Sequence, residues 1–175
     1  MKQIIALTLL ILVTSSPVFA QHIGNGGSPH DTVIGKNLTV AYGRPYKKGR
    51  VLFGTQEEHD NKKALEIFGK VWRTGADEAT QITVKRDCLF GGKPLKAGTY
   101  TLFTIPGPKE WTIIINSKLG QWGAFKYDQN KDKDVLKTTV PAGRTKSSVE
   151  QFTITLPDGG MKLEWDMVSV FVPVK

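Results

Sequence analysis

Residues 69–80 hold the densest group of side chains with chemical capability. An indole, a guanidinium and two adjacent carboxylates occur there, as Trp72, Arg73, Asp77 and Glu78. Arginine grips anions through its planar fork, and a carboxylate accepts hydrogen bonds or acts as a general base. Neighbouring residues on a strand point to opposite faces, so Asp77 and Glu78 are not expected to share one site. Trp72 is expected to anchor the core, which leaves Arg73 and Glu78 as the main candidates.

His30 is the histidine most suited to join this segment. It follows Pro29, which restricts the backbone, and it precedes Asp31. If Glu78 or Asp77 lies nearby in space, His30 would act as a general base or share a metal with them. The alternative is that His30 only forms local hydrogen bonds at one end of the fold.

Arg44, Arg50 and Arg73 all lie near glycine turns. Three converging guanidinium groups would suit an anionic ligand, because each can hold a carboxylate or phosphate with two hydrogen bonds. They would equally serve as internal ion pairs with carboxylates such as Asp31. Tyr42, two residues before Arg44, completes this part of the candidate set.

Trp122 is the aromatic residue most suited to lie on the surface. It is flanked by Gln121 and Gly123, whereas Trp111 begins an apolar run typical of a central strand. An exposed indole stacks on sugar rings, although aromatic side chains are more often buried. Trp122 is therefore a candidate contact for a glycan, and Trp111 is predicted to be core.

No standard catalytic signature is present. The sequence lacks a Gly-x-Ser-x-Gly elbow, a His-Glu-x-x-His helix, a Cys-x-x-Cys pair and a phosphate loop, so no cofactor is predicted and the question of enzyme activity stays open. Segment 128–134 has oxygen donors at alternate positions, but Lys133 and Thr139 replace the glycine and glutamate of a calcium loop. A solvated turn is favoured there, and no metal site is predicted.

The amino terminus has the pattern of a signal peptide. Lys2 precedes the apolar run 4–13, and small residues occupy the cleavage positions that end at Ala20. The interpretation is export, to the periplasm or beyond, after cleavage near Ala20. No later apolar run is long enough to span a membrane. Cys88 is the sole cysteine, which excludes an internal disulfide, and its apolar neighbours favour a buried structural thiol.

The net charge of +8 does not point to nucleic acid. The basic residues are scattered in pairs rather than gathered in one block, and nucleic acid is not an expected partner of an exported protein. A small molecule or a glycan is the expected partner class. The oligomeric state is not indicated.

Alternating apolar and polar residues predict an all-β fold. Residues 21–28 are glycine-rich and predict a flexible lead-in, and 29–175 form one domain, a single antiparallel β-sandwich of Greek-key or jelly-roll type. One short helix is predicted near residues 57–68, from helical spacing of apolar residues before Gly69. Strands are expected at 37–43, 80–84, 99–105, 111–115, 122–127, 135–140, 149–156 and 161–172.

Several short motifs identify a family resemblance. They are Ser28-Pro29-His30, Tyr42–Pro45, Lys48-Gly49-Arg50, the whole of 69–80, Gly98–Pro106 and Trp122-Gly123. On these residues the chain resembles a family of exported bacterial domains, domain of unknown function 2911. The resemblance implies a β-rich fold and no activity that can be transferred. Asp77, where the family is expected to carry asparagine more often, and the helix-like segment 57–68, where a shorter proline-containing link is expected, depart from it.

The residues therefore support three hypotheses. The leading one is a binding module for a small anionic or glycan-like ligand, with polar contacts from Arg44, Arg73, Glu78 and His30. The second is a hydrolase in which His30 or Glu78 is the base and an arginine stabilises negative charge. The third is a structural or partner-binding envelope protein, in which every polar cluster is an internal support. The separation of His30 and Glu78, and the pairing of the arginines, discriminate between them.

Overall fold

The chain folds mainly into one large, curled antiparallel sheet. The computed structural model describes residues 27–175, so the predicted signal peptide and most of the predicted flexible segment lie outside the described residues. Within them, no helix is long and apolar enough to cross a membrane. The all-β prediction is confirmed. The large sheet contains, in spatial order, β1 (His30–Ile34), β2 (Leu38–Gly43), β5 (Gln81–Val84), β8 (Gly98–Ile105), β9 (Glu110–Asn116), β10 (Asp134–Thr155) and β11 (Gly160–Pro173).

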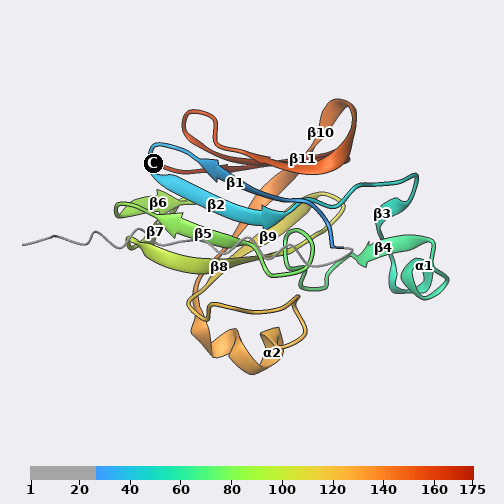
Figure 1. Cartoon of the computed structure of the whole chain (residues 1–175), viewed down its shortest axis with the longest axis horizontal. Helices are drawn as coiled ribbons and strands as arrows, with labels where there is room; N and C mark the ends of the chain where they lie inside the picture. Colours follow the sequence, from blue (N-terminus) through green and yellow to red (C-terminus); the bar gives the residue numbers. More distant parts are fainter. Residues whose placement is uncertain (1–26) are drawn as a thin grey trace, which may run out of the picture.

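Each strand of this sheet pairs with the next of its strands along the chain, so the topology is an up-and-down meander and not the expected Greek key. The other elements lie in the links between the strands of the meander. A parallel pair and a hairpin form small separate sheets, and short helices fill two links (Figure 1). These elements are β3 (Val51–Gly54) with β4 (Ala64–Ile67), β6 (Cys88–Phe90) with β7 (Lys93–Leu95), α1 (Gln56–Asp60), α2 (Tyr127–Asn130) and the 3-10 turn η1 (Lys131–Lys133).

The sheet curls at β10, because the two halves of this long strand pair with different neighbours. Its first part pairs with β9 and its second part pairs with β11, so β11 and the end of β10 lie against β1 and β2 (Figure 1). Phe152 N donates to Pro45 O at 2.9 Å, and the Tyr42 hydroxyl accepts from Ile154 N at 2.8 Å. These bonds join the end of β2 to the end of β10 around the larger of two apolar cores.

Aromatic rings dominate that core. Trp72 is 2% exposed, and its ring stacks on Trp165 with centroids 5.8 Å apart and an interplanar angle of 12°. Trp111 and Phe152 meet the same ring edge-on, at 5.9 and 5.1 Å. The predicted core positions of Trp72 and Trp111 are confirmed. Trp72 thus fixes the segment that follows it.

Two predicted elements differ from the structure. The helix ends at Asp60, and Ala64–Ile67 form β4, because this segment pairs in parallel with β3 and Lys62 adopts a left-handed φ of 57°. The predicted strand 122–127 is a turn that leads into α2. The first error arises because short apolar spacing does not distinguish helix from strand without the partner strand.

Candidate functional site

The structure brings His30 and Glu78 into direct contact. His30 begins β1, and its Nε2 atom lies 3.0 Å from Glu78 Oε2. The same nitrogen lies 4.0 Å from Asp77 Oδ2, which accepts a hydrogen bond from Ser28 N at 3.0 Å. The side chains of His30 and Glu78 are 38% and 44% exposed, so a ligand in solution can reach both.

Both carboxylates face His30 because the backbone at Asp77 departs from strand geometry. Its φ is 62°, in the left-handed region that asparagine, aspartate and glycine tolerate best. Alternation therefore fails between Asp77 and Glu78, and the expectation that they point to opposite faces is wrong. The same φ gives a physical reason why an asparagine would also be accepted at this position.

Hydrogen bonds to β2 and to buried threonines anchor the loop that carries the two carboxylates. Ala76 N donates to Gly43 O at 3.3 Å, and Thr80 Oγ1 donates to Thr74 O at 2.6 Å. Thr74 is fully buried, and its Oγ1 donates to Thr104 Oγ1 at 3.0 Å. Buried side-chain bonds of this kind hold a loop in one conformation. The two carboxylates therefore lie on a loop that is held in one conformation.

Trp122 lies next to Glu78. The two residues form an isolated antiparallel bridge, with Ala79 N donating to Gln121 O at 2.9 Å and Gly123 N donating to Asp77 O at 3.0 Å. Residues directly opposite in an antiparallel pair send their side chains to the same face, about 5 Å apart at Cβ. Trp122 is 59% exposed. An open indole thus stands beside the His30–Glu78 pair.

Arg73 and Phe125 border the same loop. Arg73 Nε donates to Gly75 O at 3.3 Å. A Cβ built on Gly123 would lie 3.1 Å from Arg73 Nη1 and 2.7 Å from Phe125 Cε2. Phe125 is 79% exposed. The sequence did not indicate this, because the segment 122–127 was predicted to be a strand. The absence of a side chain at Gly123 is what lets both the guanidinium and the ring lie close to its backbone.

The remaining predicted site residues lie elsewhere. Arg44 bonds to Asp31 Oδ2 at 3.1 Å, Thr153 Oγ1 at 3.0 Å and Phe152 O at 3.2 Å, so it ties β1 and β2 to β10. Arg50 donates to two carbonyls of its own loop. Tyr42 is buried, and burial raises the pKa of its hydroxyl. The structure therefore gathers His30, Asp77, Glu78, Trp122 and Arg73, and it places Tyr42, Arg44 and Arg50 outside that group.

Glu66 is a half-buried carboxylate that the sequence did not single out. It lies on β4 opposite Phe53. Burial raises its pKa to about 7, and the charges of Arg73 and His59 offset only part of that effect. The sequence predicted a helix over this segment, so the place of Glu66 on the half-buried strand β4 was not expected. The effect of the Arg73 charge on this pKa places Glu66 within electrostatic reach of Arg73.

This carboxylate makes stability depend on pH. Since the folded state raises the pKa of Glu66 from 4.5 to about 7, its stabilising contribution is complete below about pH 4.5 and is lost as pH rises through 7. Glu66→Gln is expected to raise the free energy of unfolding near pH 8 by an amount on the order of 1–3 kcal/mol, with little change near pH 5. Urea unfolding at both pH values measures this. Glu57→Gln, at an exposed position on α1, is the control, and equal pH profiles for wild type and Glu66→Gln would contradict the assignment.

The acidic segment 128–134 has structural roles. It forms α2 and η1 rather than the expected turn between strands. Asp134 accepts hydrogen bonds from the Tyr127 hydroxyl at 2.6 Å and from Asn116 Nδ2 at 2.8 Å, and Asp132 pairs with Lys133. Within residues 27–175 there is no cluster of three or more histidine, cysteine or acidic side chains with metal-binding geometry.

Cys88 fits the interpretation of a structural thiol. It is half-buried at the start of β6, and burial together with the neighbouring Asp87 raises its pKa. A raised pKa lowers the thiolate fraction and hence the reactivity toward electrophiles.

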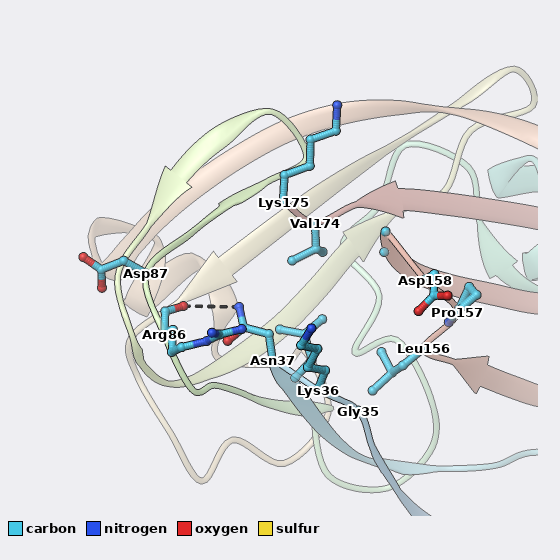
Figure 2. A pocket seen from close by; sticks show the side chains of 13 residues that line it. Gly35, Lys36, Asn37, Arg86, Asp87, Leu156, Pro157, Asp158, Val174 and Lys175 are labelled. Carbon is cyan, nitrogen blue, oxygen red and sulfur yellow. Dashed lines mark hydrogen bonds between the residues drawn. The ribbon is translucent and has the colours of Figure 1, made fainter.

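A separate cavity of about 380 Å³ lies where the β1–β2 turn, the β5–β6 link, the β10–β11 turn and the C-terminal residues meet (Figure 2). Asn37 Nδ2 donates to Arg86 O at 3.3 Å, whereas Asn37 Oδ1 is buried without a partner among the described residues. Asp87 points away from the other labelled side chains and binds Lys96 at 2.7 Å. None of the predicted site residues lines this cavity.

Comparison with known proteins supports the resemblance. The profile of a family described as a protein of unknown function (DUF2911) matches residues 28–174, which is nearly all of the described chain. The chain belongs to this family. No curated protein and no solved structure matches it. The DUF2911 match includes His30, the 73–80 loop and Trp122, so the whole candidate site lies within the family domain.

Proposed function

We propose that this DUF2911 protein is a binding module for a neutral glycan. The observation that carries the proposal is the bridge between Glu78 and Trp122, which sets an exposed indole beside the His30–Glu78 pair. Saccharide recognition uses this combination, because the ring face of a sugar packs on an aromatic plane while its hydroxyl groups bond to polar side chains. The proposal includes export, on the strength of the signal-peptide pattern in residues 1–20.

Charge favours a neutral ligand over an anionic one. Asp77 and Glu78 both approach the site, and Arg73 is the one arginine of the predicted set beside them. Arg44 and Arg50 make their hydrogen bonds elsewhere. An anion would therefore meet two carboxylates, and like charges at short range repel. Hydroxyl groups suit the same carboxylates, because they donate hydrogen bonds to them.

The test is a titration of the purified protein with a panel of neutral oligosaccharides, followed by saturation-transfer NMR and calorimetry. Trp122→Ala is expected to weaken binding at least about ten-fold, because the stacking surface is lost. Trp122→Phe should restore part of the affinity. Phe171→Ala, which truncates another exposed aromatic on β11, is the matched control and should bind as wild type does. The proposal fails if no oligosaccharide binds, or if Trp122→Ala binds as tightly as wild type.

A hydrolase is the second candidate, favoured by the 3.0 Å contact between His30 and Glu78. A histidine held by a carboxylate is oriented for proton transfer. Under this hypothesis the bound glycan is cleaved slowly by wild-type protein and not by Glu78→Gln, while His30→Gln shows the same loss. Chromatography of the glycan after incubation decides the matter, and an intact glycan leaves binding as the function.

A further inference from the structure

A second cavity, of about 520 Å³, lies away from the His30–Glu78 pair. It opens between the β8–β9 turn, β10 and β11, under two phenylalanines of the β3–β4 region. This volume is within the range of about 300–1,000 Å³ that is typical of small-molecule sites. Its lining includes Phe53, Phe68, Lys109, Trp111, Arg144 and Met167.

The walls of this groove are apolar. Phe53 packs edge-on against Trp111 with centroids 5.2 Å apart, and it stacks loosely with Phe68 at 6.4 Å. Phe53, Phe68 and Met167 are only half-buried, so each presents apolar surface to the cavity. Removing that surface from water is favourable. Methionine next to aromatic rings adapts its shape to a ligand and contacts ring edges well.

The rim of the groove is positively charged. Lys109 and Arg144 line it, and neither side chain makes a hydrogen bond or ion pair within residues 27–175. No aspartate or glutamate is among the lining residues. Glu110 alternates with Trp111 along β9 and so points to the other face. Two free cations beside an apolar wall complement an anion with an apolar body.

An irregular stretch of the β10–β11 pairing lies beside this groove. The pairing of β10 with β11 shifts between Arg144↔Val168 and Val149↔Asp166, and Asp166 has a left-handed φ of 49°. Irregular pairing redirects the side chains beside it, and a strained residue persists only where its surroundings hold it. Thr145 Oγ1 lies 3.9 Å from Met167 Sδ, so the irregular stretch contacts the side chain that it directs toward the cavity.

Asp166 is held in that strained conformation by its neighbours and does not counter the charge of the rim. Its carboxylate accepts from Lys47 Nζ and from Ser148 Oγ, both at 2.7 Å. Burial alone would raise its pKa, but these bonds and the Lys47 charge outweigh it and lower the pKa. The acidic residue nearest to Met167 in sequence is therefore already paired, which leaves Arg144 and Lys109 available.

We propose that this groove binds a small aromatic carboxylate. The ring of the ligand packs among Phe53, Phe68 and Met167, and its carboxylate bonds to Arg144 and Lys109. An aromatic body is preferred over a straight chain, because edge-to-face contacts with the two phenylalanines and the thioether contact both favour a ring. This site shares no residue with the glycan site, so each can fail without the other.

The probe is 4-fluorophenylacetate, observed by ¹⁹F NMR in the presence of the purified protein, with 4-fluorophenylacetamide as the neutral counterpart. The acid is expected to bind, and the amide about ten-fold more weakly, because it lacks the charge that the two cations recognise. Arg144→Gln should weaken binding of the acid by a similar factor. Ala142→Phe, which fills the groove from β10, should abolish binding of both probes.

Arg86→Gln is the matched control, since Arg86 is also an exposed arginine and lines the separate cavity of Figure 2. It should bind the acid as wild type does, and Trp122→Ala should do the same. Arg144→Gln lies on the surface, so its result does not depend on whether Ala142→Phe folds. The proposal is overturned if the acid does not bind, if acid and amide bind equally, or if Arg86→Gln weakens binding as much as Arg144→Gln.

Discussion

Gly43→Ala is expected to destabilise the fold by about 3 kcal/mol and to abolish glycan binding. A Cβ at this position would lie 2.2 Å from Ala76 O and 2.9 Å from Ala76 C. These are backbone atoms of the anchored loop, so they cannot rotate aside as a side chain would. The loop must move away from β2, and Asp77 and Glu78 move with it, away from His30. Urea unfolding and the oligosaccharide titration measure the two effects.

Gly49→Ala separates this steric effect from the general cost of replacing a glycine. Nothing lies within 4 Å of a Cβ at Gly49, although its φ is +69°. Its replacement should cost only about 1 kcal/mol, the strain of a left-handed alanine, and should leave binding intact. If Gly43→Ala is no more harmful than Gly49→Ala, the close approach of the loop to β2 is not what holds the site together.

The strands of this protein are predictable where a local pattern suffices. Leu38, Val40 and Tyr42 alternate with smaller or polar residues, and all three are buried in β2. The order of the strands is not local information, and neither is the division of β10 between two partners. Ala64–Ile67 shows the same limit. Its conformation is determined by pairing with the parallel strand β3, whereas its apolar spacing alone indicates a helix.

The candidate site is predictable in its residue types but not in its geometry. His30 and Glu78 could be proposed as partners because imidazole and carboxylate attract each other. The approach of Asp77 to the same histidine depends on a left-handed φ, which a strand pattern does not reveal. Phe125 was missed because its exposure follows from a turn that the apolar pattern concealed. Arg44 has the residue type of a ligand contact, but its three bonds make it a link between β1 and β10.

Trp72→Ala is expected to be the most damaging substitution in the core, with a loss of about 3–5 kcal/mol. The indole is 2% exposed and contacts the rings of Phe53, Trp111, Phe152 and Trp165. Its removal leaves a cavity at the centre of the curled sheet that these rigid rings cannot fill by small shifts. A domain of this size is stable by only about 5–15 kcal/mol, so the variant should be largely unfolded at moderate urea concentrations.

Trp72→Phe is the informative partner of this substitution. Trp72 Nε1 is buried and has no hydrogen-bond partner among residues 27–175. Phenylalanine keeps one ring against Trp165 and removes the unpaired donor, whose burial costs about 1–3 kcal/mol. The gain offsets much of the lost packing, so Trp72→Phe should lose less than about half of what Trp72→Ala loses. Both variants lack Nε1–H, so the difference between their losses measures the packing of the ring that phenylalanine keeps against Trp165. Equal losses would contradict the assignment of ring packing as the main contribution of Trp72 to the support of the 73–80 loop.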